Sequence, residues 1–162
     1  MKAKYLCFSL TFFLWSLVGS TQKLIHNYIA KYKHIAIERM KSDGIPASVI
    51  MGISIVESGA GSSPVCKKLK NHFGIVGKNT NSVAKLGYKS KYKEYKTDAE
   101  SYMHFSQVVQ RKKFYKKLKG NKDYKEWIIA LDKANYSSAK QKWVNKIIQT
   151  IAKYKLYELD KA

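Results

Sequence analysis

The sequence is poor in cysteine, in arginine and in acidic residues. Its two cysteines are Cys7 and Cys66, its two arginines are Arg39 and Arg111, and 11 acidic residues face 31 basic ones. Cys7 lies in an apolar leader that we expect to be removed, so Cys66 is left without an internal disulfide partner. An exported domain of this kind must therefore be held together by its hydrophobic core.

The first 20 residues have the layout of a secretory signal peptide. Two lysines precede an apolar run over residues 5–18, and the small residues Gly19 and Ser20 follow. The alternative is an uncleaved membrane anchor, but the run is shorter than the roughly 20 residues that a spanning helix needs. We therefore predict export to the periplasm, the cell wall or the medium, with cleavage near Ser20.

The formal net charge is +20 and comes almost entirely from lysine. One interpretation is that lysine-rich faces adhere to an anionic envelope polymer or membrane surface. The other is that these lysines only solvate the outer faces of helices. Nucleic-acid binding is disfavoured, because the chain is expected to be exported and its lysines follow no known recognition module. No linker or repeat divides residues 21–162, and we expect one monomeric domain.

Hydrophobic periodicity predicts a mainly α-helical domain with a small β-hairpin. Apolar residues recur at three- and four-residue steps over residues 24–40, which indicates an amphipathic helix that ends near Gly44. Pro46 then suits the first position of a second helix. Residues 49–56 are apolar on nearly every face, so this helix is expected to be central and buried, and Gly59 ends it. A loop and a small β-hairpin are predicted over residues 76–95. Further helices are predicted over residues 62–70, 97–110, 114–118, 123–131 and 138–151.

The residue types and motifs in the sequence fit few kinds of catalytic chemistry. The four histidines are scattered without metal-ligand spacing, so no metal and no cofactor are predicted. The glycine-rich turn follows a helix rather than a strand, which argues against a phosphate cradle, and no nucleophile-elbow motif occurs. Glu57 remains, at the end of the buried helix. Dry surroundings and the negative end of the helix dipole should both raise its pKa, as a general acid that protonates a glycosidic oxygen requires. The alternative is a surface glutamate hydrogen-bonded into the following turn.

The segment IPASVIMGISIVESGAG, followed by NHFGI, resembles the glucosaminidase family of peptidoglycan hydrolases. The similarity continues through YKEYKTDAESYMHFS and YKEWIIALDKANYSS to LYELD, and so spans about residues 24–160. It implies a lysozyme-like α domain with a small β-lobe, and an endo-β-N-acetylglucosaminidase that cleaves β-1,4 bonds in peptidoglycan. Glu57 matches the family's catalytic acid and Tyr136 a tyrosine near it, with Asn135 in place of the usual glycine. The implied substrate-binding residues are Asn71, His72, Phe73, Gly74 and Tyr95.

The chain departs from the family where a second glutamate is often found. Residues 76–93 contain no Asp or Glu, and Glu94 is the nearest candidate for a second carboxylate. Three alternatives follow: the substrate's 2-acetamido group acts as the nucleophile while Tyr136 orients it, Glu94 swings in, or the site is degenerate. At the level of function, the alternatives are a muramidase, a lytic transglycosylase, a non-catalytic peptidoglycan-binding protein and a cationic membrane-active protein.

Overall fold

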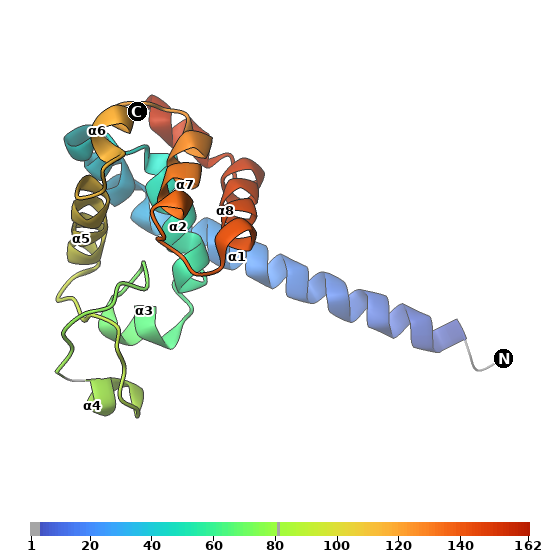
Figure 1. Cartoon of the computed structure of the whole chain (residues 1–162). Coiled ribbons are helices and arrows are strands. Elements are labelled where there is room, and N and C mark those ends of the chain that lie inside the picture. Colours follow the sequence, from blue (N-terminus) through green and yellow to red (C-terminus); the bar gives the residue numbers. More distant parts are fainter. Residues whose placement is uncertain (1–3, 81) are drawn as a thin grey trace.

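The computed structural model describes the backbone of residues 4–80 and 82–162, and side chains from residue 20 onward except at Ser82. The chain is mainly helical, as the periodicity predicted (Figure 1). The elements are α1 (Lys4–Asp43), α2 (Ala47–Ser58), α3 (Pro64–Leu69), α4 (Ser82–Leu86), α5 (Asp98–Gln110), α6 (Tyr115–Leu118), α7 (Tyr124–Lys133), α8 (Lys140–Lys153) and the 3-10 helix η1 (Leu156–Lys161).

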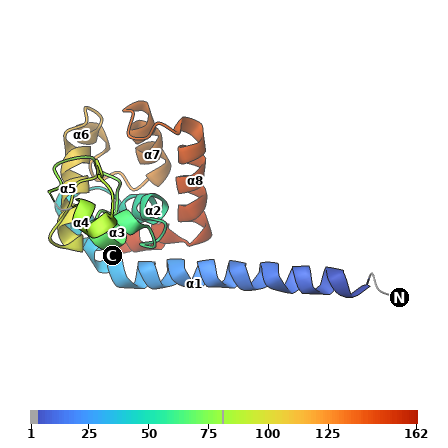
Figure 2. The ribbon, with the colours of Figure 1, turned by 90° about the horizontal axis from the view of Figure 1, so that it is seen from below.

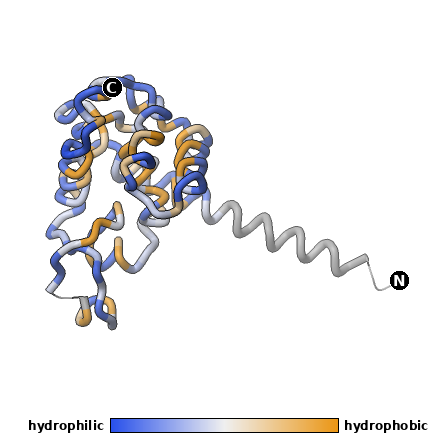
Figure 3. The backbone as a smooth tube through the Cα atoms, viewed as in Figure 1, coloured by the Kyte–Doolittle hydropathy of each residue, from blue (hydrophilic) through white to orange (hydrophobic). Residues whose placement is uncertain are grey.

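Helix α2 is the centre of the domain. It contacts α1, α7, α8 and η1, and nearly all of its side chains are buried (Figure 1). A helix that is apolar on every face cannot lie at the surface, so the other helices pack around it. The hydropathy colouring shows apolar stretches of the surrounding helices gathered about the same interior (Figure 3). Gly59 ends α2 in the left-handed conformation, with φ +58°.

Helix α1 runs along one side of the domain (Figure 2). Its packed face carries Tyr28, Tyr32 and Ala36, which are spaced at four-residue intervals and all buried. The predicted signal peptide, residues 1–20, falls almost wholly outside the side chains that the structure describes, and it stays a prediction. Among the described residues, no helix has both the length and the apolar character needed to cross a membrane.

The C-terminal helix η1 holds the start of α2 in place. The Asp160 carboxylate accepts hydrogen bonds from the backbone N–H of Ser48 at 2.8 Å and from its hydroxyl at 2.6 Å. Asp160 is buried, and burial raises the pKa of its carboxyl despite these bonds. The contact joins η1 to the central helix and satisfies an N-terminal backbone donor that α2 cannot pair within itself.

The predicted β-hairpin lobe is wrong. The region folds instead as irregular backbone with the short helix α4 and one isolated antiparallel bridge between Val76 and Tyr92. Two backbone hydrogen bonds flank the bridge, from Gly77 N to Lys91 O and from Lys93 N to Ile75 O. The next ladder bond, between Ile75 N and Lys93 O, does not form, because the Asn71 side chain accepts from Ile75 N at 3.1 Å and donates to Lys93 O at 2.8 Å. The tyrosines that suggested alternation are also spaced by four and three residues, which is not the two-residue period of a strand.

Helix caps follow the sequence in two places and depart from it in a third. The Thr97 hydroxyl accepts from Glu100 N at 3.1 Å, as expected at the start of α5, and Asp123 accepts from Lys125 N at the start of α7. The last helix, predicted to start at residue 138, has no such cap. Helix α8 begins two residues later, with Ala139 at the cap position and no side-chain hydrogen bond there.

Candidate active site

Glu57 lies in the last turn of α2, where the buried helix reaches a cavity in the surface. Its side chain is half-buried, and burial raises the pKa of its carboxyl. A hydrogen bond from Trp143 and the positive charge of Lys146 act in the opposite direction, but burial dominates. A carboxyl with a raised pKa keeps its proton closer to neutral pH, as a general acid must.

Trp143, on α8, holds the Glu57 carboxyl. Its indole Nε1 donates to Glu57 Oε1 at 2.6 Å. The indole is buried and packs against the Tyr136 ring, with 5.5 Å between the ring centroids. The motifs in the sequence do not single out this residue. One feature of the sequence does point to a polar partner for Trp143: a tryptophan that lies next to core-facing residues of a helix needs a hydrogen-bond acceptor for its indole N–H.

Asn71 fixes the shape of the loop that faces Glu57. Its side-chain oxygen accepts from Phe73 N at 3.3 Å and from Ile75 N at 3.1 Å, while its amide donates to Ile75 O at 2.9 Å and to Lys93 O. The side chain is buried beneath the loop and does not line the cavity. Asn71 therefore shapes the loop that brings Phe73 and Gly74 to the cavity wall.

Gly74 brings bare backbone up to the carboxyl. Its φ is +65°, which favours glycine. A Cβ at this position would lie 3.4 Å from Glu57 Oε2 and 3.9 Å from the Tyr92 ring. The absence of a side chain therefore leaves the second carboxyl oxygen open toward the cavity.

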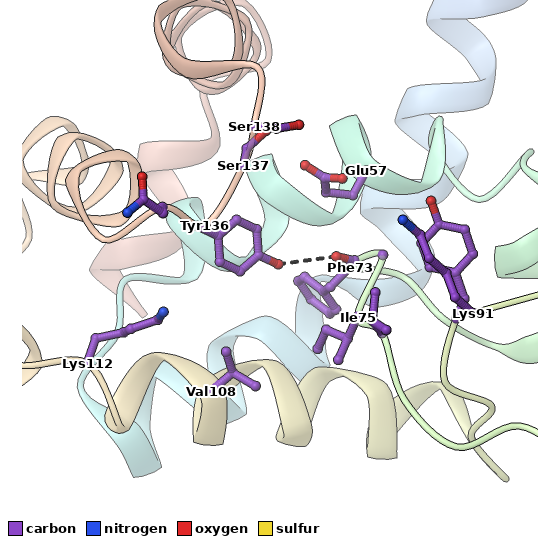
Figure 4. Close-up of a pocket in the computed structure, with 13 residues that line it drawn as sticks. Glu57, Phe73, Ile75, Lys91, Val108, Lys112, Tyr136, Ser137 and Ser138 are labelled. Atoms are coloured by element: carbon purple, nitrogen blue, oxygen red, sulfur yellow. Dashed lines mark hydrogen bonds between the residues drawn. The ribbon is translucent and has the colours of Figure 1, made fainter.

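Tyr136 lies beside Glu57, and its hydroxyl donates to Phe73 O at 3.2 Å (Figure 4). Burial raises the pKa of Tyr136, and the neighbouring charge of Glu57 raises it further, so the phenol stays protonated. Asn135, which precedes it, has φ +55°. Asparagine is among the few non-glycine residues that accept this conformation readily, so the backbone here does not require glycine.

The cavity has a volume of about 410 Å³, and Figure 4 shows Glu57 and Tyr136 on its wall. Among the described residues that line it, Glu57 is the only carboxylate. Aromatic, hydroxyl and basic groups surround it, a mixture that suits a polar ligand with apolar ring faces. In the described part of the chain, no three His, Cys, Asp or Glu side chains gather as metal ligands. The lining residues are Glu57, Phe73, Gly74, Ile75, Val76, Lys91, Tyr92, Val108, Lys112, Asn135, Tyr136, Ser137 and Ser138.

Comparison with known proteins decides the family. The family described as mannosyl-glycoprotein endo-beta-N-acetylglucosaminidase, or glucosaminidase, matches residues 33–156. The chain belongs to the glucosaminidase family. The resemblance seen in the sequence motifs is thereby confirmed, and the domain is of glycoside hydrolase type.

Two solved structures share the fold of this glucosaminidase-family chain. The catalytic domain of the autolysin Auto from Listeria monocytogenes superposes with a TM-score of 0.69 at 19% identity, over 85% of this chain and 88% of that one. The glycoside hydrolase domain of FlgJ from Salmonella typhimurium superposes with a TM-score of 0.62 at 16% identity, over 83% and 90%. A comparison with curated protein sequences found no match.

His72, predicted to bind substrate, lies inside this glucosaminidase-family fold and not in the cavity. Its Nδ1 is 2.6 Å from the Tyr28 hydroxyl and 3.4 Å from Cys66 Sγ, and its Nε2 is 3.0 Å from Asp98 Oδ1. Burial lowers the pKa of His72 although Asp98 acts to raise it, and the charge of Lys31 lowers it a little further. The ring therefore links α1, the loop and α5 as a neutral group.

Tyr95 and Glu94 lie at a second cavity, away from Glu57. Tyr95 is buried, with its hydroxyl 2.7 Å from His104 Nδ1. Glu94 forms an ion pair with Lys85. Neither residue lines the cavity that contains Glu57. The structure thus brings together Glu57, Phe73, Gly74 and Tyr136, but not the candidate second carboxylate.

Proposed function

We propose that this protein is an exported endo-β-N-acetylglucosaminidase that cleaves β-1,4 glycan bonds of peptidoglycan, with Glu57 as the general acid. The observation that carries the proposal is a half-buried carboxyl with a raised pKa, at the end of the central helix and on the wall of the cavity, in a glucosaminidase-family chain. The two structural neighbours are by description an autolysin domain and a glycoside hydrolase domain, which supports a glycan of the cell wall as the substrate.

The lone carboxylate favours a substrate-assisted mechanism. Inverting and retaining glycosidases pair two carboxylates across the scissile bond, and Glu94 is held by Lys85 at the other cavity. In the proposed reaction Glu57 gives its proton to the glycosidic oxygen as the bond to C1 breaks. The carbonyl oxygen of the substrate's own 2-acetamido group attacks C1 and closes a positively charged oxazolinium ring. Water then attacks C1 and gives a proton to the Glu57 carboxylate, the bond from C1 to the ring oxygen breaks, and the acetamido group and the protonated acid are both regenerated.

Tyr136 has a defined part in this mechanism. Because its hydroxyl donates its proton to Phe73 O, the lone pairs of the phenol oxygen are free to accept. An acetamido N–H can supply that hydrogen bond, and the amide is then held in one orientation for the attack. Tyr136→Phe should therefore lower kcat about 10-fold, the loss of roughly one hydrogen bond.

Five lysines line the second cavity. Its volume is about 640 Å³, and two carboxylates, Glu94 and Glu100, accompany the lysines on its wall. Each of these acids already has a partner: Glu94 pairs with Lys85 and Glu100 accepts from Lys96 N. We propose that this surface holds an anionic polymer of the envelope while the first cavity cleaves the glycan. Its lysines are Lys68, Lys70, Lys78, Lys85 and Lys96.

The salt dependence of sacculus binding can be compared with the salt dependence of glycan cleavage. Attraction between exposed charges is screened beyond a Debye length, which is about 8 Å at physiological ionic strength. Binding to purified sacculi should therefore weaken as salt rises, whereas cleavage of short soluble glycans should change less. An equal response of both to salt would contradict the assignment of the lysine surface.

Product analysis tests the reaction itself. Purified peptidoglycan is digested with wild type, with Glu57→Gln and with Glu94→Gln as a matched control, and the new ends are identified by mass spectrometry. Reducing N-acetylglucosamine ends support the proposal, and Glu57→Gln should lower release by about 10²–10⁴-fold. On short soluble glycans, whose cleavage does not need the lysine surface, Glu94→Gln should cleave like wild type.

Other products would identify the alternative activities. New N-acetylmuramic acid ends would indicate a muramidase, and anhydro ends a lytic transglycosylase. Binding to sacculi without any release would favour the non-catalytic protein, to which the lone carboxylate in the cavity also points. Bacteriolytic activity that survives Glu57→Gln and disappears with salt would favour the cationic membrane-active protein.

A further inference from the structure

The two oxygens of the Glu57 carboxyl have different surroundings. Oε1 accepts the indole N–H of Trp143, which lies behind the carboxyl and is not among the residues that line the cavity. Oε2 lies beside Gly74, where even a Cβ would be only 3.4 Å away, and both Gly74 and Glu57 line the cavity. The Glu57 carboxyl is thus hydrogen-bonded at Oε1, while Oε2 lies on the side of the cavity.

This asymmetry decides which oxygen carries the proton. A protonated carboxyl has one carbonyl oxygen, which accepts hydrogen bonds well, and one hydroxyl oxygen, which donates. Because the indole N–H can only donate, its partner Oε1 is the carbonyl oxygen of the protonated acid. The hydroxyl proton then lies on Oε2, on the side that faces the cavity.

We propose that Trp143 is a positioning residue that orients the Glu57 carboxyl and directs its transferable proton to Oε2, the oxygen beside Gly74. The inference rests on the proposed function of Glu57 as general acid. When the proton leaves Oε2 for the glycosidic oxygen, the O–H bond breaks and negative charge develops on the carboxyl. The Trp143 hydrogen bond then becomes charge-assisted and roughly twice as strong, so it stabilises the transition state more than the starting acid.

Among the described residues, Trp143 alone donates a hydrogen bond to the Glu57 carboxyl. Lys146, on the same helix as Trp143, contributes a positive charge, but no hydrogen bond from it to Glu57 is formed. The Tyr136 hydroxyl donates its proton to Phe73 O and so does not donate to Glu57. The Tyr92 ring lies next to Gly74. Trp143 therefore supplies the directed hydrogen bond, and Lys146 a diffuse field.

The first test needs no substitution at Trp143. The indole Nε1–H resonances of nitrogen-15-labelled protein are followed from about pH 4 to pH 9, the range in which a shifted carboxyl titrates. The Trp143 resonance should move as Glu57 ionises, with a midpoint equal to the basic limb of the pH–rate profile, and Glu57→Gln should abolish the movement. Trp127 is the internal control, since its Nε1 donates to the backbone oxygen of Asn121 at 2.8 Å and should stay still. A Trp143 resonance that does not titrate would overturn the proposal.

The second test compares two tryptophan variants. Trp143→Phe keeps an aromatic ring against Tyr136 but removes the donor. We expect kcat to fall about 10- to 100-fold, as for a lost hydrogen bond to a charged group, and the basic limb of the profile to move to higher pH. Trp127→Phe makes the same chemical change elsewhere in the core. It should lower the melting temperature and leave the limb in place.

The outcomes separate this proposal from the proposed function. A loss of activity in Trp143→Phe without a shift of the limb, or equal shifts in both tryptophan variants, would reduce Trp143 to a packing residue. If Trp143→Phe does not fold, the resonance titration of the wild type still decides. A titrating Trp143 resonance together with a fully active Glu57→Gln variant would instead overturn Glu57 as the general acid.

Discussion

Gly74→Ala tests the geometry of the proposed active site with a single methyl group. At φ +65° an alanine is strained, and its Cβ would lie 3.4 Å from Glu57 Oε2. The left-handed conformation costs an L-residue about 1–2 kcal/mol. For a domain of this size, that loss lowers the melting temperature by about 2–8 °C.

The effect on catalysis should be larger than the effect on stability. A glycosidic oxygen must come within about 2.6–3.2 Å of the carboxyl that protonates it, and the new methyl group would stand beside that position. A displacement of about 1 Å in a reacting group can cost about 100-fold in rate. We therefore expect kcat/KM of Gly74→Ala on soluble glycan fragments to fall by about that factor.

Gly120→Ala is the matched control. Gly120 has φ +83°, but a Cβ there would meet no heavy atom within 4 Å, so the backbone strain is similar and no methyl group is placed beside the carboxyl. Thermal unfolding and glycan cleavage are measured for both variants. Full activity in Gly74→Ala would refute the placement of the scissile bond beside Oε2, and an equal loss of activity in Gly120→Ala would show that strain alone accounts for it.

Three further predictions concern the scaffold. In Gly52→Ala the new Cβ would lie 2.6 Å from Ile151 Cγ1, so overpacking of about 1–3 kcal/mol should outweigh a helix-propensity gain of about 1 kcal/mol; guanidinium unfolding that shows a more stable protein would contradict this. Asn71→Ala should lower the free energy of unfolding by about 3 kcal/mol, because it leaves buried loop donors unpaired, and a urea midpoint close to that of wild type would refute the role of Asn71. Since burial lowers the pKa of His72 below the ordinary value of about 6.5, the unfolded chain binds a proton first as pH falls. Stability from neutral His72 should therefore be complete near pH 7.5 and decline as pH drops through about 6.5, a decline that His72→Gln should reduce; an unchanged pH dependence in that variant would rule it out.

Much of the site could be predicted from the amino-acid sequence, because its determinants are local. The apolar run after Pro46 predicts a buried helix, and a carboxyl on its last turn must lie close to the same dry interior. Phe73 and Gly74 were expected near the acid only through the family resemblance, and both line its cavity. The place of Glu57 at the end of the central helix follows from the apolar run alone.

Other predictions went wrong or remained open where long-range contacts decide. The β-hairpin is reduced to a single bridge, because the Asn71 side chain takes both Ile75 N and Lys93 O, the next pair of the ladder. The pattern of the sequence placed His72 in the same motif as Gly74, yet the loop turns the imidazole into the core toward Tyr28. Neighbours in sequence can face opposite sides of a loop, and only packing selects the side.

The sequence by itself therefore determined a lysine-rich, mainly helical domain with one acid at the end of its central helix, since these features depend on composition and period. Tertiary structure alone decided what surrounds that acid. Trp143 lies far from Glu57 along the chain, yet α8 brings its indole N–H to one carboxyl oxygen. The loop places Gly74 beside the other oxygen. Hydrogen bonds between distant helices depend on how those helices pack, and no periodicity in the chain encodes that arrangement.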